Sequence, residues 1–524
     1  MLLNSFSELD FRKLNALVSD YYRNSSAVRD LFEIEPSLHE IAGCAKDRQF
    51  SSEQYGTLHE VLLNQYARLI SIRQVNENIQ AFAEEDAVCV TTGHQLCLLG
   101  GPAYFFYKII STIKLAQNLQ SLVPTKKVVP VFWLASEDHD REEINHTFHN
   151  GSRIEWNTSQ SGAVGRFGLN GFDDVLKTWL ETVHDERLRE KLFDTWSRAM
   201  EMNTWSELTQ SWVHECFGEW GLVVINPDDA RFKKMFAPII KRELLEGIAF
   251  TCVSRSNEML VQHGYNVQVN PRELNLFYLS PHSRVRIEKV ADAWHTTDMQ
   301  RTWSESELME EVDKHPENFS PNVLLRPLYQ ETILPNLAYV GGPGELAYWL
   351  QLKSLFTECK MRIPALVLRD SAIILSRANG KRLTKLGLNA NDLLRDKQEL
   401  ITTLAGERPD FSNEKNELVQ LFERLAERIG KVEPTLMATT MADAQRALTG
   451  IDQLQAKAWK AIKMKEEQKL TAFEKIWEEV YPSNNWQERS QNIVKEAMSN
   501  DKEMIRQLLN AFQPPKSTLV IVEI

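Results

Sequence analysis

The sequence lacks long apolar runs and basic blocks, and each absence excludes a class of protein. Its 524 residues are 43% hydrophobic and 25% charged. No window approaches the roughly 20 apolar residues that a membrane-spanning helix requires. The net charge is -12 and Lys and Arg do not cluster, so we do not expect a nucleic-acid partner. No basic segment precedes an apolar run at the N-terminus, so no signal peptide is expected and the predicted location is the cytoplasm.

Closely spaced cysteines are also missing. The chain has six cysteines, no Cys-x-x-Cys pair, and mostly apolar residues around each thiol. This spacing favours buried, reduced cysteines over a zinc site or a disulfide framework. The chain is nonetheless long enough for two or three domains, each with a hydrophobic core.

Short apolar runs alternate with helical segments, which predicts the fold class. Such runs are typical of strands in a parallel sheet that is covered on both faces. We therefore expect an α/β fold whose ligands bind beyond the carboxyl ends of the strands. The predicted strands are 87–91, 128–134, 221–227, 338–340 and 365–368.

Two segments interrupt this alternation. Residues 148–171 are rich in glycine and lack a helical period, so we expect a β-rich excursion or a loop. Residues 267–269, 276–279 and 284–288 alternate as edge or hairpin strands do. We therefore place insertions near 148–175 and 265–320.

The C-terminal third changes to long helical segments. Apolar residues recur at near-heptad spacing between Leu418 and Ile429 and again after Pro434, flanked by Lys and Glu. This pattern predicts an antiparallel α-helical coiled coil, an arm that more often serves as scaffold or dimer contact than in catalysis. The last apolar run, 518–524, is expected to return as a strand to a sheet edge. The predicted domains are a core at 1–378, a coiled coil at 379–513 and a returning strand at 514–524.

Three glycine-rich segments follow or adjoin predicted strands. Successive N–H groups at such turns, with the positive end of the next helix, stabilise phosphates or carboxylates. None matches G-x-G-x-x-G or G-x-x-x-x-G-K-[ST], so the glycines could equally serve tight turns. The segments are Thr92-Gly93-His94-Gln95, Gly100-Gly101-Pro102 and Gly341-Gly342-Pro343-Gly344.

Four ionisable residues, Glu137 to Asp140, directly follow the strand 128–134. Burying them costs free energy unless they hold a metal, a cationic substrate or each other. A carboxylate among them could bind a substrate ammonium or accept its proton. His139 and His146 with Asp138 or Asp140 could ligate a divalent ion, but their spacing matches no established ligand set, and we predict no metal.

Two further side chains, His94 and Arg326, are candidates, and other polar residues lie near them in the sequence. His94 could donate to a phosphate or act as an acid or base near neutral pH, or be a structural histidine. Arg326 offers a planar fork for a carboxylate or phosphate, with Gln330 one turn further along a helix; the alternative is a surface salt bridge. Lys108 and Lys114 are expected to be solvated.

These motifs, taken in order, resemble those of the bacillithiol biosynthesis cysteine-adding enzymes. The similarity covers nearly the whole chain, and its most specific parts are the Glu-Asp-His-Asp and Gly-Gly-Pro-Gly-Glu blocks. Gln is as readily expected at position 94 in this family, which argues against an essential acid–base role for His94. The matching segments are Thr92–Gln95 with Gly101–Pro102, Pro130–Trp133 with Glu137–Asp140, Pro321–Val323 with Leu325–Pro327, and Gly341–Glu345 followed by Tyr348.

The resemblance implies a Rossmann-like core with small insertions and a homodimer formed through the coiled coil. It also implies that L-cysteine is joined to the amine of glucosaminyl-malate, with ATP as the expected activator of the carboxyl group. An alternative is a non-catalytic nucleotide- or thiol-binding protein, and another is a metal-dependent hydrolase. The residues predicted to act in catalysis are His94, Glu137, Asp138, His139 and Arg326. Those predicted to bind substrate or nucleotide are Thr92, Gly93, Gln95, Gly101, Gln330, Gly341, Gly342, Gly344, Glu345 and Tyr348.

Overall fold

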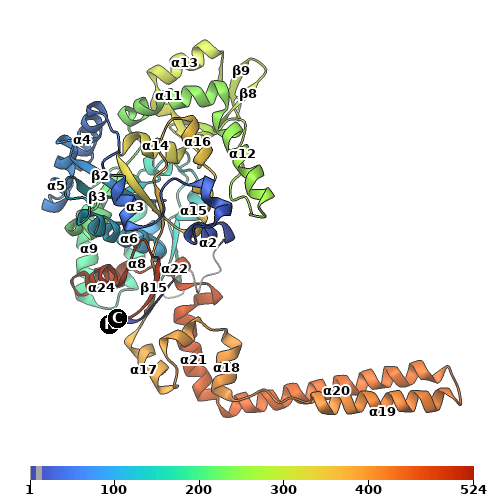
Figure 1. The fold of residues 1–524 in the computed structure, drawn as a ribbon. Helices are drawn as coiled ribbons and strands as arrows, with labels where there is room; N and C mark the ends of the chain where they lie inside the picture. The colour runs from blue at the N-terminus through green and yellow to red at the C-terminus, as the bar shows by residue number, and fades with distance from the viewer. Residues whose placement is uncertain (1, 8–14, 150–151) are drawn as a thin grey trace. The chain divides into compact units, whose positions relative to one another are not determined.

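The computed structural model describes residues 2–7, 15–149 and 152–524 (Figure 1). The chain forms two compact units. The first combines Met1–Ile373 with Asn485–Val522, and the second combines Ile374–Asn484 with the last two residues. The predicted coiled-coil range, 379–513, therefore extends past the C-terminal end of the second unit's main segment.

A five-stranded parallel sheet forms the centre of the first unit, which confirms the predicted α/β class. The strand order is β13-β12-β2-β3-β6, and every neighbouring pair is parallel. Along β2 the buried side chains alternate between two clusters, because successive residues of a strand point to opposite faces. The strands are β2 Ala87–His94, β3 Lys127–Leu134, β6 Val223–Ile225, β12 Asn336–Gly341 and β13 Ala365–Leu368.

Helices pack on both faces of this sheet. Leu115 and Leu119 of α6 share one buried cluster with Val90 of β2, while Leu58 and Phe236 of α4 and α11 lie in the cluster on the other face. The helices near the sheet are α2 Ala16–Tyr22, α3 Leu38–Gly43, α4 Ser52–Tyr66, α5 Arg73–Ala83, α6 Tyr104–Gln120, α11 Ala230–Glu246, α12 Ile248–Gln262, α14 Arg326–Ile333, α15 Pro343–Leu350 and α16 Lys353–Glu358.

The first expected insertion is a two-stranded hairpin followed by helices. β4 and β5 pair antiparallel, and the helices after them surround a cluster of buried tryptophans that includes Trp156, Trp196 and Trp205. The elements are α7 Arg141–Ile144, β4 His146–His149, β5 Ser152–Glu155, α8 Phe172–Glu181, α9 Glu186–Met200 and α10 Trp205–Phe217.

The second expected insertion is an antiparallel sheet with the order β10-β9-β8-β7-β11. The predicted strand at 267–269 is wrong. The backbone N–H groups of Gln268 and Val269 donate to the side chain of Gln351, at 3.1 and 3.0 Å, instead of pairing with a strand. The elements are β7 Leu276–Ser280, β8 Ser283–Val290, β9 Ala293–Thr296, β10 Thr302–Trp303, α13 Glu305–Lys314 and β11 Phe319–Pro321.

The C-terminal strand β15, Thr518–Glu523, is present as predicted but is not an edge strand. It lies between β1, Leu2–Ser7, and β14, Ser371–Leu375, in a separate three-stranded sheet. The run Leu519–Val522 is buried throughout, which suits a central strand better than an edge. The helices before it are α22 Gln487–Ser490, α23 Val494–Met498 and α24 Glu503–Ala511.

The second unit contains the predicted antiparallel helix pair. The two long helices α19 and α20 lie side by side, drawn in orange in Figure 1. The second helical run is interrupted at Glu466, the residue between α20 and α21, so it is two helices and not one. The helices are α17 Arg377–Lys385, α18 Lys397–Ala405, α19 Ser412–Gly430, α20 Leu436–Lys465 and α21 Glu467–Val480.

None of the helices within the described ranges is both long and apolar enough to cross a membrane. All six cysteines are free, and four of them are buried, which confirms the expectation of unpaired thiols.

Candidate active site

A cavity of about 640 Å³ lies in the first unit, beyond the carboxyl ends of β2, β3 and β12. This is the position predicted from the parallel sheet. The predicted residues that line it are Gly93, His94, Gln95, Glu137, Asp138, His139, Arg326, Glu345 and Tyr348. The predicted residues that do not line it are Thr92, Gly101, Gln330, Gly341, Gly342 and Gly344.

The interpretation of Thr92–Gln95 as a glycine-rich turn is wrong, because β2 continues through His94. The Thr92 hydroxyl donates to the Val340 carbonyl at 2.7 Å, and the Gly93 carbonyl accepts from the Lys108 ammonium. Parallel pairing with β3 over its full length keeps this segment extended. The glycine permits close approach of a neighbouring strand: a side chain there would press on Trp133.

The other two glycine segments are turns, but neighbouring side chains occupy them. Gly101 has a φ of +57°, and a side chain at this position would overlap Cys97. The Gly342 N–H donates to Glu345 Oε2 at 2.9 Å, so Glu345 already occupies an amide expected to bind an anion. In both segments the geometry follows the tight-turn alternative.

Lys108 is buried, so the prediction of a solvated lysine is wrong. Its Nζ lies 2.7 Å from Glu345 Oε2, and the Tyr339 hydroxyl donates to Glu345 Oε1 at 2.6 Å. Burial raises the pKa of the Glu345 carboxyl, but Lys108, the Gly342 N–H and Tyr339 outweigh it and lower the pKa to about 2. Glu345 is therefore an ionised carboxylate at the cavity wall.

Arg326 begins α14, and its guanidinium lies over the rings of Trp133, Tyr339 and Trp349, at 5.8, 5.3 and 5.6 Å. Its Nη1 donates to Gln330 Oε1 at 3.0 Å, so Gln330, which is fully buried and outside the cavity, holds the guanidinium. Within the described part of the chain no carboxylate forms an ion pair with Arg326. The alternative of a surface salt bridge is therefore wrong.

Glu137 is buried and forms an ion pair with the fully buried Lys233 of α11. Burial raises the pKa of Glu137, and the charge of Lys233 opposes that rise. Burial likewise lowers the pKa of Lys233, opposed by Glu137. Glu137 is thus held by a structural partner behind the cavity wall.

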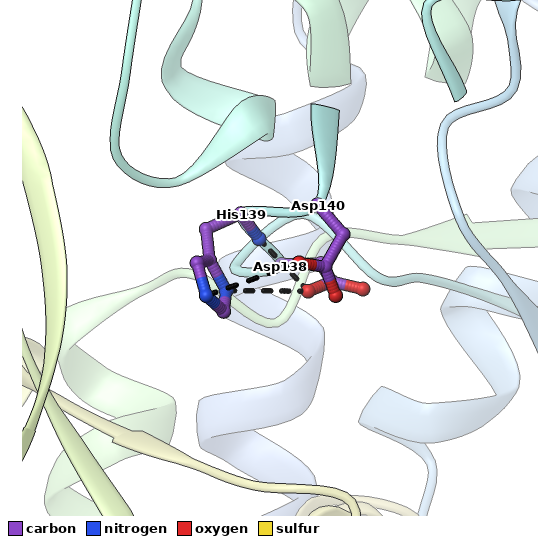
Figure 2. Close-up of side chains that lie close together, drawn as sticks. All are labelled: Asp138, His139 and Asp140. Atoms are coloured by element: carbon purple, nitrogen blue, oxygen red, sulfur yellow. Dashed lines mark hydrogen bonds and ion pairs between the residues drawn. The ribbon is translucent and has the colours of Figure 1, made fainter. Parts of the chain in front are cut away.

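Asp138, His139 and Asp140 project together after β3 (Figure 2). Asp138 accepts from the Gln95 side chain at 2.9 Å and from the His139 backbone N–H at 2.8 Å. Burial raises the pKa of Asp138, but the neighbouring His139, the hydrogen bond from Gln95 and the charge of Arg284 together place it well below the ordinary value. Asp138 is a carboxylate at neutral pH.

These three side chains carry the only grouping of metal-ligand atoms found among the described residues, all within 4.8 Å of one another. The donors suit a hard divalent ion. However, the Arg284 guanidinium lies 2.9 Å from His139 Nδ1, where it opposes a cation. His146 lies on β4 and is not part of the grouping.

His94 is a neutral ring near pH 7, because burial and the charge of Lys108 lower its pKa to about 3. Its Nδ1 lies 3.0 Å from the Gln95 carbonyl, and its ring is 5.1 Å from that of Tyr104. As a neutral imidazole it does not serve as an acid near neutral pH, which fits the doubt raised by Gln at this position in the resembling family.

Sequence reasoning missed several cavity residues. Arg284 and Arg286 of β8 alternate onto the same face, and Arg284 lies 4.0 Å from the Phe277 ring. Two arginines on alternate positions of one predicted strand were a visible signal of a charged face. That Arg284 would contact His139 was not visible from the sequence. The missed lining residues also include Tyr104, Lys108, Arg272 and Tyr339.

Two family models together cover nearly the whole chain. The model described as the N-terminal Rossmann-like domain of bacillithiol biosynthesis BshC matches residues 5–370, and the model of its C-terminal coiled-coil domain matches residues 372–524. The chain belongs to the BshC family. The resemblance seen in the sequence motifs is thereby confirmed, as are the Rossmann-like core and the coiled-coil domain.

Relatives in this family align along almost the entire chain. A protein of Cytophaga hutchinsonii is 34% identical over 96% of both chains, and one of Christiangramia forsetii is 33% identical over 100% of this chain and 99% of its own. A Bacillus cereus protein is 27% identical over 91% of this chain and 92% of its own. Each bears the name "Putative cysteine ligase BshC".

Proposed function

We propose that this BshC-family protein is a carbon–nitrogen ligase that joins the carboxyl group of L-cysteine to the amine of glucosaminyl-malate, the last step of bacillithiol biosynthesis. The names of its relatives support the ligase class. The cavity supports substrates that carry both charges, because an arginine without a carboxylate partner and an ionised aspartate face the same space of about 640 Å³.

Arg326 is the observation that carries this proposal. It is charged, it lines the cavity, and its Nη2 has no hydrogen-bond partner among the described residues. A buried N–H donor left in this state is costly unless a ligand supplies the acceptor. A substrate carboxylate or a nucleotide phosphate offers two oxygens in the geometry that a guanidinium fork matches.

The other side of the cavity suits the amine. Asp138, an ionised carboxylate at the cavity, can hold and orient the substrate ammonium, and His139 lies beside it. Arg272 and Arg286 also line the cavity, and within the described ranges neither forms an ion pair, so they extend the anion-binding surface. Catalysis would consist mainly of positioning and charge stabilisation.

Amide formation from a free carboxylate is uphill in water, so the carboxyl group of cysteine must first be activated. We propose ATP as the activating substrate. The nucleotide phosphates and the malyl carboxylates are both anionic, so the same arginines are suitable for either.

We further propose that the protein acts as a homodimer through the coiled coil, in the cytoplasm. Exposed apolar side chains on α19 and α20, such as Leu421, Met437 and Leu454, support an association surface. Six unpaired cysteines are in keeping with a reducing compartment. Sedimentation of the purified chain tests the proposed homodimer. A monomer at micromolar concentration would contradict it.

The direct test is mass-spectrometric detection of product from purified protein, L-cysteine and glucosaminyl-malate, with and without ATP. We expect the amide product in the ATP mixture. Product without ATP would refute ATP as the activating substrate but would still support the proposed ligase activity. Saturable substrate binding with no product under any condition would favour the alternative of a non-catalytic binding protein.

A further inference from the structure

Arg284 connects the second insertion to the polar residues after β3. It lies on β8, and its side chain is only 8% exposed. The guanidinium packs on the Phe277 ring, its Nε donates to Ser320 Oγ at 3.2 Å, and its Nη2 donates to the Pro321 carbonyl at 3.0 Å. Three anchored contacts leave this guanidinium little freedom to turn, so the direction of its third nitrogen, Nη1, is fixed.

That third nitrogen faces His139. Arg284 Nη1 lies 2.9 Å from His139 Nδ1 and 3.8 Å from Asp138 Oδ1. A guanidinium has only donors, so two N–H groups would oppose each other if Nδ1 carried a proton. The lone pair of Nδ1 must therefore accept from Arg284, which leaves the proton of the neutral ring on Nε2.

Asp138 does not compete effectively for the same nitrogen. His139 Nδ1 lies 3.6 Å from Asp138 Oδ1, longer than the contact with Arg284 and beyond hydrogen-bond distance. Asp138 is already engaged by Gln95 and by the His139 backbone N–H. On the other side of the ring, Nε2 lies 3.9 Å from Asp140 Oδ1, too far for a hydrogen bond, so its N–H remains open to a ligand.

We infer that Arg284 is a positioning residue that fixes the tautomer of His139, so that His139 acts as a hydrogen-bond donor and not as a general base. This inference rests on the proposed function for its catalytic meaning and deepens it. In this tautomer both ring nitrogens are committed: one lone pair accepts from Arg284 and the other nitrogen carries a proton. The ring therefore has no free lone pair with which to deprotonate the attacking amine.

The tautomer is testable without turnover. We would label the protein with ¹⁵N-histidine on a deuterated background and record two-bond ¹H–¹⁵N correlations, assigning His139 by its loss in His139→Gln. We expect the pattern of an Nε2–H ring in the native chain and a shift toward a mixture in Arg284→Met. A native ring protonated on Nδ1 would overturn the inference, and so would a pattern unchanged by Arg284→Met.

Arg286→Gln is the matched control for this spectrum. It removes a cation two residues along the same strand, and no hydrogen bond joins Arg286 to His139. Its His139 pattern should equal that of the native chain. Where Arg284→Met fails to fold, Arg284→Lys is the second variant: it keeps a cation but not the fixed guanidinium fork, so the Nε2–H pattern should weaken, and an unchanged pattern would overturn the role of Arg284.

Turnover separates a donor from a base. A glutamine side chain can accept from Arg284 through its oxygen and donate through its nitrogen, as the inferred ring does. We expect His139→Gln to retain turnover within about tenfold, while His139→Ala loses about 100-fold, as loss of a catalytic donor does. Equal loss in both variants would overturn the donor role. Absence of product from the native chain would instead refute the ligase proposal and leave the spectrum as the test of the tautomer.

Discussion

The two compact units differ in what they bury. In the first unit, several charged groups are buried in pairs, such as Lys233 with Glu137 and Arg369 with Glu488. In α19 and α20 of the second unit, only Ala426 and Ala444 are buried, and larger apolar side chains remain exposed. Burying charge costs free energy that packing alone does not return. The difference supports the proposals that the chemistry belongs to the first unit and self-association to the second.

The largest expected effect is on Arg326. Arg326→Ala should abolish turnover, a loss of at least about 100-fold, because it removes the one cavity arginine with an unpartnered buried nitrogen. Measured kcat/KM should fall while circular dichroism stays native. Arg255→Ala, an exposed arginine on α12, is the control and should keep full activity. Near-native turnover in Arg326→Ala would contradict the assignment of the chemistry to this cavity of the first unit.

Asp138→Asn should also abolish turnover, because the amide has the same size but no charge to hold an ammonium. The expected loss is about 100-fold or more, measured as product per minute under saturating substrates. Asp174→Asn, on the exposed side of α8, provides the matched exchange. If Asp138→Asn and Asp174→Asn behave alike, the carboxylate has no part in the reaction.

Lys108→Met should lower the free energy of unfolding by about 1–3 kcal/mol, because it removes the ammonium partner of the half-buried Glu345 carboxylate. Denaturant unfolding measures this. Adding Glu345→Gln to the same chain should recover part of the loss, since no carboxylate is then left without its cation. Lys114→Met, on the same helix and without an ion pair, should change stability by less than about 1 kcal/mol.

The Glu345 carboxylate should also make stability depend on pH. Its pKa in the folded chain, about 2, lies below the ordinary value of 4.5, so the ionised form favours the folded state. This contribution is complete above about pH 4.5 and is lost as the pH falls toward 2. The stability difference between the native chain and Glu345→Gln should shrink across that window. A constant difference would show that Glu345 is not held ionised by its neighbours.

The smallest expected effect on turnover concerns the second unit. Met437→Ser and Leu454→Ser replace exposed apolar side chains of α20, so folding stability should change by no more than about 0.5 kcal/mol and turnover by less than twofold. Self-association, followed by sedimentation, should weaken. If turnover fell while self-association stayed unchanged, the coiled coil would take part in the chemistry. That result would contradict the assignment of chemistry to the first unit alone.

Local patterns were sufficient for the elements and for part of the site. Apolar runs identified the five strands of the parallel sheet, and heptad spacing identified the antiparallel pair of α19 and α20. The rule that ligands bind at the carboxyl ends of parallel strands placed Asp138 and His139 at the cavity, whereas Arg326 was selected only for its guanidinium fork. The anion-binding role predicted for the glycine segments was less reliable. A turn and the end of a strand have similar local sequences, and only the position of the partner strand distinguishes them.

The sequence by itself determined the α/β class, the coiled coil and the type of residue at the site, because these depend on spacing along the chain. Only the tertiary structure decided which charges meet. Lys108 reads as a solvated helix residue, yet it is buried against Glu345, 237 positions along the chain. Arg284 meets His139 across 145 positions. Such pairs depend on how strands and insertions pack, and packing between distant segments leaves no periodic signal in a single sequence.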